Sequence, residues 1–597
     1  MDTIYGLKPI DLAVIVAYFA VVMFIGFRAS HKVHTDEDYF VGGRRFGKGL
    51  LTMHWLCTGT HSEQAVQVAG AAARVGMGGI WYQWMWLFST PFYWLLAPIV
   101  RRLRVMTTGD FFRMRFGQSL EILYGVIGTC FLIFSIATLL RGAGATISGA
   151  TGGEIPTEES IIVLSLLFSS YIMTGGLMAA AYTDALQGFM IIIFSCLLVP
   201  VGLAHIGGME GMRAALPPEM FSITAPSGAA EGDPVFVIAV SLLGLVGIIS
   251  QPHVVTANGA GKTEREAQIG MCYGNFIKRF LTIAWTMTGM IALVVFLKDF
   301  EHLTPGSAEY IHQTETLFGR AVQELLGDGW RGLMIACIIA GVTSAEALMV
   351  VGAGLFSRNC YAPLFPGQTP QQMLWSGRIA SVAILLGGIV LAFTAESITQ
   401  LYVTSIQIIA LLGPAIWLGI CWRRTNPLGV WLSFFVGVLI WSLTAWPIEL
   451  IAAQVEGSSV ASLVESIKLS HLSKPAQILI SLVSQFGMLI LAGLLTPSQD
   501  RKLLDALYAR LLTPIGREHE VLLDDRSQPL PESATLGMND GIVIDYEKAK
   551  PAAIKMLQPF GLEIPRLSAF DVIGFAGAWL LVGGLIGLLY VIANWGA

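Results

Sequence analysis

The sequence predicts an all-α protein that crosses a lipid bilayer many times, and two features of its composition carry that prediction. Of the 597 residues, 54% are hydrophobic and 13% are charged, whereas an average soluble domain has about 25% charged residues. The apolar residues also occur in long runs, such as Ile161–Met173 and Phe189–Ala204, which contain no charged residue. Because a helix needs about 20 apolar residues to cross the hydrocarbon layer, each such run is a candidate membrane span.

The length of the apolar runs predicts about fourteen membrane helices. They lie near residues 9–28, 49–73, 78–100, 118–141, 159–175, 181–206, 233–252, 270–297, 330–356, 372–394, 397–421, 428–449, 475–496 and 566–593. The first run lacks the basic leader and the small-residue cleavage pattern of a signal peptide, so we take it as a membrane helix.

Lysine and arginine gather in alternate loops, and this pattern predicts the orientation of the chain. The basic residues of these loops are Lys32, Arg44, Arg45, Lys48, Arg101, Arg102, Arg104, Arg113, Arg115, Lys262, Arg265, Arg358, Arg423 and Arg424. The loops near 142–158, 207–232, 298–329 and 450–474 are acidic or nearly neutral on balance. We therefore expect a multi-pass protein of a cell membrane (inner or plasma) with its basic loops in the cytoplasm and both termini outside.

Residues 497–565 are polar and connect the last two spans on the predicted cytoplasmic side. Asp500–Leu512 is expected to form an amphipathic helix at the membrane interface. Arg517–Glu520 contains a histidine and two acids, but neighbours at that spacing do not share a helix face, so a solvated loop is favoured over a metal site. The cysteines lie singly and mostly inside apolar runs, as small buried hydrophobes do. The sequence shows no nucleophile–base pairing and no metal-ligand spacing of the kind that would indicate an enzyme.

Ionisable residues inside membrane spans are costly, so each of them is a candidate functional residue. The predicted spans contain Glu63, Asp184, Lys278, Arg279 and Glu346. Asp184 and Arg279 have a second interpretation, in which they lie near helix ends and reach water. For Glu63 and Glu346, a buried structural ion pair is the alternative to a functional role.

The second span contains a small, polar stretch, Leu56–Ser62, with Gly59 in its middle. A helix break at membrane depth is tolerated where it lines a cavity or is buried in protein, and its free carbonyls can coordinate a cation such as sodium. Close packing of small residues is the alternative. The seventh span, Phe236–Ser250, contains Gly244 and Gly247 and lies five spans later, which is the spacing of broken helices in transporters built from inverted five-helix repeats.

Four motifs give the chain a resemblance to a known family. They are Asp38-Tyr39-Phe40-Val41-Gly42-Gly43-Arg44, Thr343-Ser344-Ala345-Glu346, Phe356-Ser357-Arg358-Asn359-Cys360-Tyr361 and Trp422-Arg423-Arg424-Thr425-Asn426-Pro427-Leu428-Gly429. Because these motifs occur together in this order and spacing, the chain resembles the sodium/solute symporter family. This family includes sodium/glucose, sodium/proline and sodium/iodide cotransporters. The resemblance covers about residues 11–440.

The resemblance implies a leucine-transporter-type fold with two inverted five-helix repeats. The implied divisions are 1–48 for the first helix and its loop, 49–206 and 233–421 for the two repeats, 428–496 for additional helices, 497–565 for the cytoplasmic segment and 566–597 for the last helix.

The resemblance also implies a sodium site between the second and ninth spans. Its ligands are expected to be the carbonyls of Cys57, Thr60 and Ala340 and the hydroxyls of Thr343 and Ser344. Asp184 and Glu346 match acidic residues that couple sodium to transport. Ala347 stands where some members have a serine, which leaves a second sodium site open.

The residues that match or resemble a substrate pocket of this family are His61, Glu63, Gln64, Tyr82, Gln83, Lys278 and Gln407. Amide and carboxylate groups next to aromatic faces suit a ligand with many hydroxyls, so a sugar or polyol is the first expectation. An organic acid or amino acid comes next, because Lys278 and Arg279 could bind a carboxylate.

The implied activity is sodium-coupled symport of a small solute by alternating access, with the lipid bilayer, sodium and the solute as partners and no nucleic acid. A proton-coupled carrier with a relay of Glu63, Asp184 and Glu346 is the main alternative. A sensor built on a transporter fold is a remote one, since residues 497–565 have no kinase-like features. The sequence leaves the oligomeric state open.

Overall fold

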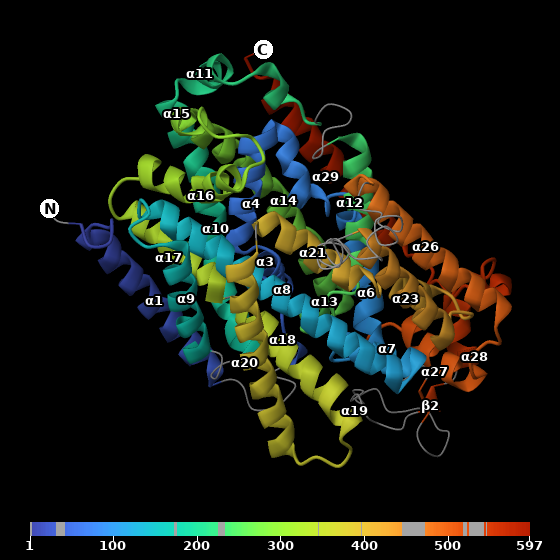
Figure 1. Ribbon diagram of the computed structural model, residues 1–597. Helices are drawn as coiled ribbons and strands as arrows, with labels where there is room; N and C mark the ends of the chain where they lie inside the picture. Colours follow the sequence, from blue (N-terminus) through green and yellow to red (C-terminus); the bar gives the residue numbers. More distant parts are fainter. Residues whose placement is uncertain are drawn as a thin grey trace, which may run out of the picture.

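The computed structural model describes residues 3–31, 42–171, 176–224, 233–343, 345–395, 397–444, 472–516, 522–523, 543–544 and 546–596. In this part of the chain nearly all regular structure is helical, and the helices form one bundle (Figure 1). The strands described are two short antiparallel ones, β1 (Leu522–Leu523) and β2 (Val543–Ile544).

Most membrane spans are long single helices. They are α1 (Pro9–Ser30), α8 (Gln118–Ala150), α9 (Thr157–Tyr171), α10 (Gly176–His205), α14 (Glu264–Val295), α20 (Pro370–Thr394), α23 (Pro427–Thr444), α26 (Lys474–Leu495) and α29 (Ala569–Asn594). The other predicted spans consist of consecutive shorter pieces. These are α3 (Lys48–Thr58) with α4 (Ser62–Val75), η2 (Gly76–Ile80) with α5 (Trp81–Trp84) and α6 (Thr90–Leu103), α12 (Pro234–Ile248) with α13 (Pro252–Gly259), and α21 (Ile398–Ala410) with α22 (Gly413–Cys421). The predicted span near 330–356 contains α17 (Trp330–Thr343) and α18 (Ala345–Phe356), on either side of Ser344, which lies outside the described residues.

Broken helices account for part of the difference between the span count from sequence and a count by helix length in the described residues. Among the described residues, nine helices are long and apolar enough to cross a membrane when α21 and α22 are taken together, and the bent pair α12–α13 makes a tenth. The predicted spans near 49–73, 78–100, 159–175 and 330–356 do not meet that test as unbroken helices. The first is interrupted between α3 and α4, and the second contains irregular turns. The described part of α9 has 15 residues, and Ser344 between α17 and α18 lies outside the described residues.

Glycines allow several helices to cross at very short distance, as is common in membrane proteins. A Cβ on Gly289 of α14 would lie 2.2 Å from the Ala69 carbonyl oxygen of α4, and one on Gly332 of α17 would lie 2.4 Å from the Asp11 carbonyl oxygen of α1. The Asp11 carboxylate also accepts hydrogen bonds from the backbone N–H groups of Gly329 and Gly332 at 2.7 and 2.9 Å. These contacts fix α1 against α17.

The shorter helices gather at the two ends of the bundle (Figure 1). The helices α11 (Gly208–Ala215), α15 (Leu297–Phe300) and α16 (Ala308–Leu325) lie at one end together with both chain termini. At that end Lys8 forms an ion pair with Asp328 at 2.7 Å, and Arg213 donates to the Trp595 carbonyl at 3.0 Å. The helices α7 (Thr108–Phe116), α19 (Ala362–Leu364), α27 (Arg501–Leu512) and α28 (Tyr546–Ala549) lie at the other end.

The predicted amphipathic helix of the polar segment is present as α27, but its apolar face packs against protein. Leu507, Tyr508 and Leu511 are buried, and the Tyr508 hydroxyl donates to the Gly419 carbonyl at 3.0 Å. The reason is that this face packs on the helices α6, α7 and α28 at this end of the bundle. Arg517–Glu520 lies outside the described residues.

Candidate functional site

The second span is broken where the sequence predicts a break, between α3 and α4. Thr58 ends α3, His61 has an extended backbone (φ −114°, ψ 170°), and Ser62 begins α4. The free Gly59 carbonyl accepts hydrogen bonds from Gln64 Nε2 at 2.8 Å and from Lys278 Nζ. The buried Thr60 hydroxyl makes no hydrogen bond with the described residues. The break therefore holds polar backbone and side-chain groups in the middle of the bundle.

A second break separates α12 from α13, and the pair is bent by 56°. The sequence places it near Gly244 and Gly247, but the helix continues to Ile248 and the break ends before Pro252. Proline has no N–H and clashes with the preceding helical turn, so it ends α12 there. The freed Ser250 carbonyl accepts a hydrogen bond from the Tyr124 hydroxyl at 2.7 Å.

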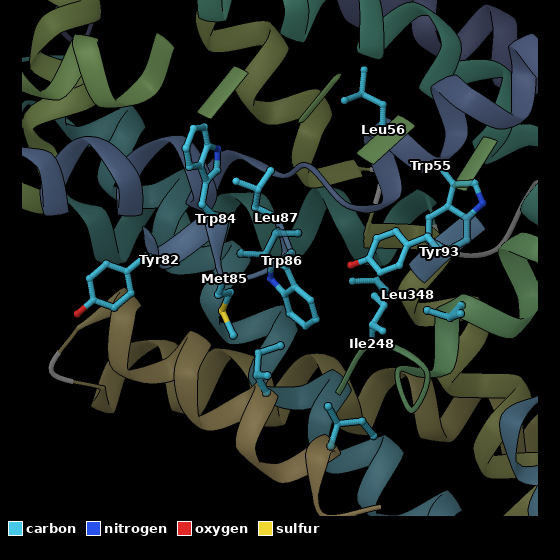
Figure 2. Packing of buried hydrophobic residues seen from close by; sticks show 14 of the residues in the cluster. Trp55, Leu56, Tyr82, Trp84, Met85, Trp86, Leu87, Tyr93, Ile248 and Leu348 are labelled. Carbon is cyan, nitrogen blue, oxygen red and sulfur yellow. The ribbon is translucent and has the colours of Figure 1, made fainter. Parts of the chain in front are cut away.

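A cavity lies between the two breaks, and residues of both breaks line it. Its polar lining residues are Thr58, His61, Glu63, Gln64, Tyr93, Ser135, Thr138, Gln251, His253, Asn275, Lys278, Arg279, Tyr402 and Ser405. Its aromatic and apolar walls include Trp55, Ile248 and Leu348, which Figure 2 shows close to Tyr93. We call this space the central cavity.

Three charged side chains line the central cavity, and all three are buried. Glu63 comes from α4, whereas Lys278 and Arg279 are neighbours on α14. Glu63 and Lys278 carry opposite charges and lie near each other, but Lys278 donates its hydrogen bond to the Gly59 carbonyl and forms no ion-pair contact with Glu63. Arg279 lies beside the Tyr93 hydroxyl, and its Nε and Nη1 atoms make no hydrogen bond with the described residues.

Asp184 lies outside the central cavity and forms a buried pair with His54. Its Oδ2 atom is 2.8 Å from His54 Nδ1, and the two side chains are 1% and 0% exposed. The Cys57 thiol donates to the Asp184 carbonyl at 3.0 Å. Asp184 therefore lies beside the C-terminal turn of α3, which leads into the first break. This removes the alternative that Asp184 lies at a helix end and reaches water.

The predicted sodium ligands are only partly within the described structure. Cys57 and Thr60 lie at the first break, and a second cavity of about 430 Å³ joins Thr60 to Cys337 and Ile338 of α17. The predicted site requires this proximity of the break to α17. The Ser344 residue and the side chains of Ala340, Thr343 and Glu346 lie outside the described residues, so the sodium site stays a prediction.

The predicted substrate residues fall into two groups. His61, Glu63, Gln64 and Lys278 line the central cavity together, whereas three others lie elsewhere. Gln83 donates to Gln67 at 3.0 Å, Tyr82 packs against Phe236 with ring centroids 5.6 Å apart, and Gln407 lines a separate cavity beside α26. Figure 2 shows Tyr82 well apart from Trp55 and Tyr93.

Several lining residues were not identified from the sequence as parts of the site. They are Tyr93, Gln251, His253, Asn275 and Tyr402. Pro252 was the available signal for Gln251 and His253, because it marks the second break. Nothing in the local sequence distinguishes Tyr93 or Tyr402 from other aromatic residues of membrane helices.

Comparisons with known proteins agree with this architecture. The model of the sodium:solute symporter family matches residues 39–437. The sodium/myo-inositol cotransporter 2 of Oryctolagus cuniculus is 24% identical over 474 residues, which cover 73% of this chain and 69% of that protein. The sodium/glucose cotransporter 1 of the same organism is 25% identical over 470 residues, which cover 72% and 71%.

Among solved structures, a sodium-coupled sialic acid symporter in a substrate-bound outward-open state matches with a TM-score of 0.63 and 17% identity. The match covers 82% of this chain and 99% of that one. This similarity shows the fold. It is the leucine-transporter-type fold that the sequence resemblance implies.

Proposed function

This chain belongs to the sodium:solute symporter family and is a sodium-coupled solute symporter, and we propose that its solute is a small polyhydroxylated molecule bound in the central cavity. The arrangement that carries the proposal is the meeting of both broken helices at one buried, polar space. In transporters of this architecture, broken helices supply the binding groups near the middle of the bilayer.

The chemistry of the central cavity suits hydroxyl groups. Carboxylate and amide groups of Glu63, Gln64 and Asn275 line it beside the rings of Trp55 and Trp86. Hydroxyls both donate and accept hydrogen bonds, so they can pair with each of these side chains while the rings cover the apolar faces of the solute. The inositol and glucose cotransporters among the relatives carry solutes of this kind, as their names state.

We propose that sodium binds where α17 passes the first break, with ligands from Cys57, Thr60, Ala340, Thr343 and Ser344. Sodium there would hold α4 against α17 and so stabilise the shape of the central cavity that accepts the solute. Coupling requires sodium to bind that state better than the others. Inward movement of one sodium ion releases about 2.3 kcal/mol per 100 mV of membrane potential, in addition to its concentration gradient.

The orientation predicted from the basic loops belongs to this proposal. The end of the bundle with α11, α16 and both termini would face outward, and the end with α7 and α27 would face the cytoplasm. Solute and sodium would enter from the first end and leave at the second.

One observation favours a contribution of protons to coupling. His54 and Asp184 form a pair within a fully buried environment, and Asp184 Oδ1 makes no hydrogen bond with the described residues. Uptake at pH 5.5 and 7.5, with sodium replaced by choline, separates the two cases. Uptake that persists in choline and follows the pH gradient would favour the proton-coupled carrier. Loss of this proton-driven uptake in Asp184→Asn would assign the proton-binding role to the His54–Asp184 pair.

The experiment for the proposed function is uptake into proteoliposomes that contain the purified full-length protein. Labelled myo-inositol, glucose, sorbitol and glucuronate are offered with an inward sodium gradient or with choline. Sodium-dependent uptake of at least one compound is expected, and Gln64→Ala should reduce it at least about tenfold. Gln407→Ala is the matched control, since that glutamine lies outside the central cavity. Equal effects of both variants, or no sodium-dependent uptake of any of these compounds, would refute the proposal.

A further inference from the structure

Arg279 is a buried cation without a counter-charge among the described residues. Its side chain is 1% exposed and comes from the middle of α14, where it lines the central cavity. The ion pairs of the described chain do not include it, and its Nε and Nη1 atoms make no hydrogen bond with described residues. Its neighbours among the ionisable groups are the hydroxyls of Tyr93 and Tyr402.

The other charges of the central cavity do not compensate Arg279. Glu63 interacts with Lys278, so these two side chains cancel to a net charge of zero. With both histidines neutral, Arg279 leaves the cavity with one positive charge. A sodium ion bound at the nearby first break would add a second positive charge.

A guanidinium group cannot relieve this cost by losing its proton, because arginine stays charged in proteins. A buried charge needs a partner of opposite sign, or it destabilises the fold. Arginine binds carboxylates through two parallel N–H···O hydrogen bonds, donated either by its two terminal nitrogens or by Nε and Nη2. Nη1 of Arg279 has no partner among the described residues, so it is available for the first of these contacts.

We propose that the solute is an anion, namely a hydroxylated carboxylate of the sugar-acid type, and that Arg279 binds its carboxylate inside the central cavity. Tyr93 and Tyr402 flank the carboxylate, and the hydroxyl groups of the solute reach Gln64 and Asn275. This inference rests on the proposed function and names the class of its solute.

The test compares acids with neutral compounds of the same skeleton. Purified protein in detergent is heated at fixed sodium concentration and ionic strength with D-glucuronate or D-glucose, and with D-gluconate or sorbitol. At least one acid should raise the melting temperature more than its neutral partner does. Arg279→Gln should raise the apparent dissociation constant of that acid at least about tenfold, because two charge-assisted hydrogen bonds are lost. Arg213→Gln, at the end of the bundle, is the control and should bind as the wild type does.

The comparison of each acid with its neutral partner needs only the wild-type protein, so it holds even if Arg279→Gln does not fold. Arg279→Lys supplies a second variant, which keeps the charge and loses the planar pair of donors; it should bind the acid more weakly than the wild type.

Three results would each overturn the inference. The first is stabilisation by neutral sugars alone, and the second is equal stabilisation by chloride and by every carboxylate. The third is a carboxylate effect that does not depend on Arg279. Sodium-dependent binding of a neutral polyol that Gln64→Ala abolishes would keep the proposed function and reject this inference. Binding of an acid that depends on Arg279 but does not respond to sodium would keep this inference and reject the proposed sodium coupling.

Discussion

Gly142 of α8 is the position where one added methyl group should disturb the first break most directly. A Cβ at Gly142 would lie 2.3 Å from the Glu63 Cβ and 2.4 Å from the Glu63 Cα. Carbon atoms pack best at about 3.5–4.0 Å, so in Gly142→Ala the start of α4 has to move away from α8 by at least about 1 Å. One of the two close atoms belongs to the backbone, and therefore a side-chain rotation cannot relieve the contact.

The expected free-energy cost of Gly142→Ala is that of overpacking a protein core. An extra methyl group in a tightly packed contact costs about 1–3 kcal/mol. If the strain is released by displacing Glu63 and the break, the same energy appears as a loss of apparent solute affinity of about 5- to 150-fold. If the strain stays in the folded state, it appears as a lower melting temperature instead.

Both outcomes are measurable with the same preparation. Sodium-dependent uptake into proteoliposomes gives the apparent affinity, and thermal unfolding in detergent gives the melting temperature. Gly583→Ala on α29 is the matched control, because a Cβ there meets no atom within 4 Å. If Gly142→Ala has the uptake and the melting temperature of Gly583→Ala, the close approach of α8 to Glu63 is not as the structure describes.

Three further changes test other parts of the structure. Lys278→Met should destabilise the protein by about 1–3 kcal/mol because the buried Gly59 carbonyl loses a charged donor and the buried Glu63 loses a nearby positive charge, and the double variant with Glu63→Gln should regain part of the lost melting temperature; no recovery would contradict an electrostatic coupling of these two side chains. Arg115→Lys should lower the melting temperature at a cost of about 2–4 kcal/mol, since this fully buried guanidinium donates to four carbonyls, one at the end of α22 and three in the loop before α23, and lysine cannot reproduce that planar set. Thr343→Ala and Ser344→Ala should each weaken the sodium dependence of uptake far more than they reduce expression, and normal sodium activation in both variants would refute the proposed sodium ligands.

Local sequence was sufficient for the membrane helices and for the first break. Long uncharged runs determine where a helix can lie in lipid, because each backbone group is paired within its own helix and needs no partner elsewhere. Gly59 and the polar residues around it marked the interruption of the second span, and the structure has it at that place. The second break was placed a turn too early, because glycine was weighed above the helix-ending effect of Pro252.

The central cavity shows what the sequence left undetermined. Ile406 lines that cavity, while its neighbour Gln407 lines the separate one beside α26. Successive residues of a helix point about 100° apart, so only the rotation of α21 within the bundle decides which of them meets the solute. In the same way, hydropathy placed Lys278 and Arg279 within a membrane span, but it left open whether Arg279 reaches water and did not reveal the contacts of either side chain.

The sequence by itself determined the class of protein, the positions of most membrane helices and the family, since these depend on runs and motifs that are contiguous in the chain. The tertiary structure alone decided that Glu63 lies near Lys278, that His54 covers Asp184, and that Arg279 faces the cavity without a carboxylate among the described residues. These are contacts between helices far apart in sequence. They depend on how glycines such as Gly142 let the helices approach, and pairwise distances of that kind are set by packing rather than by local pattern.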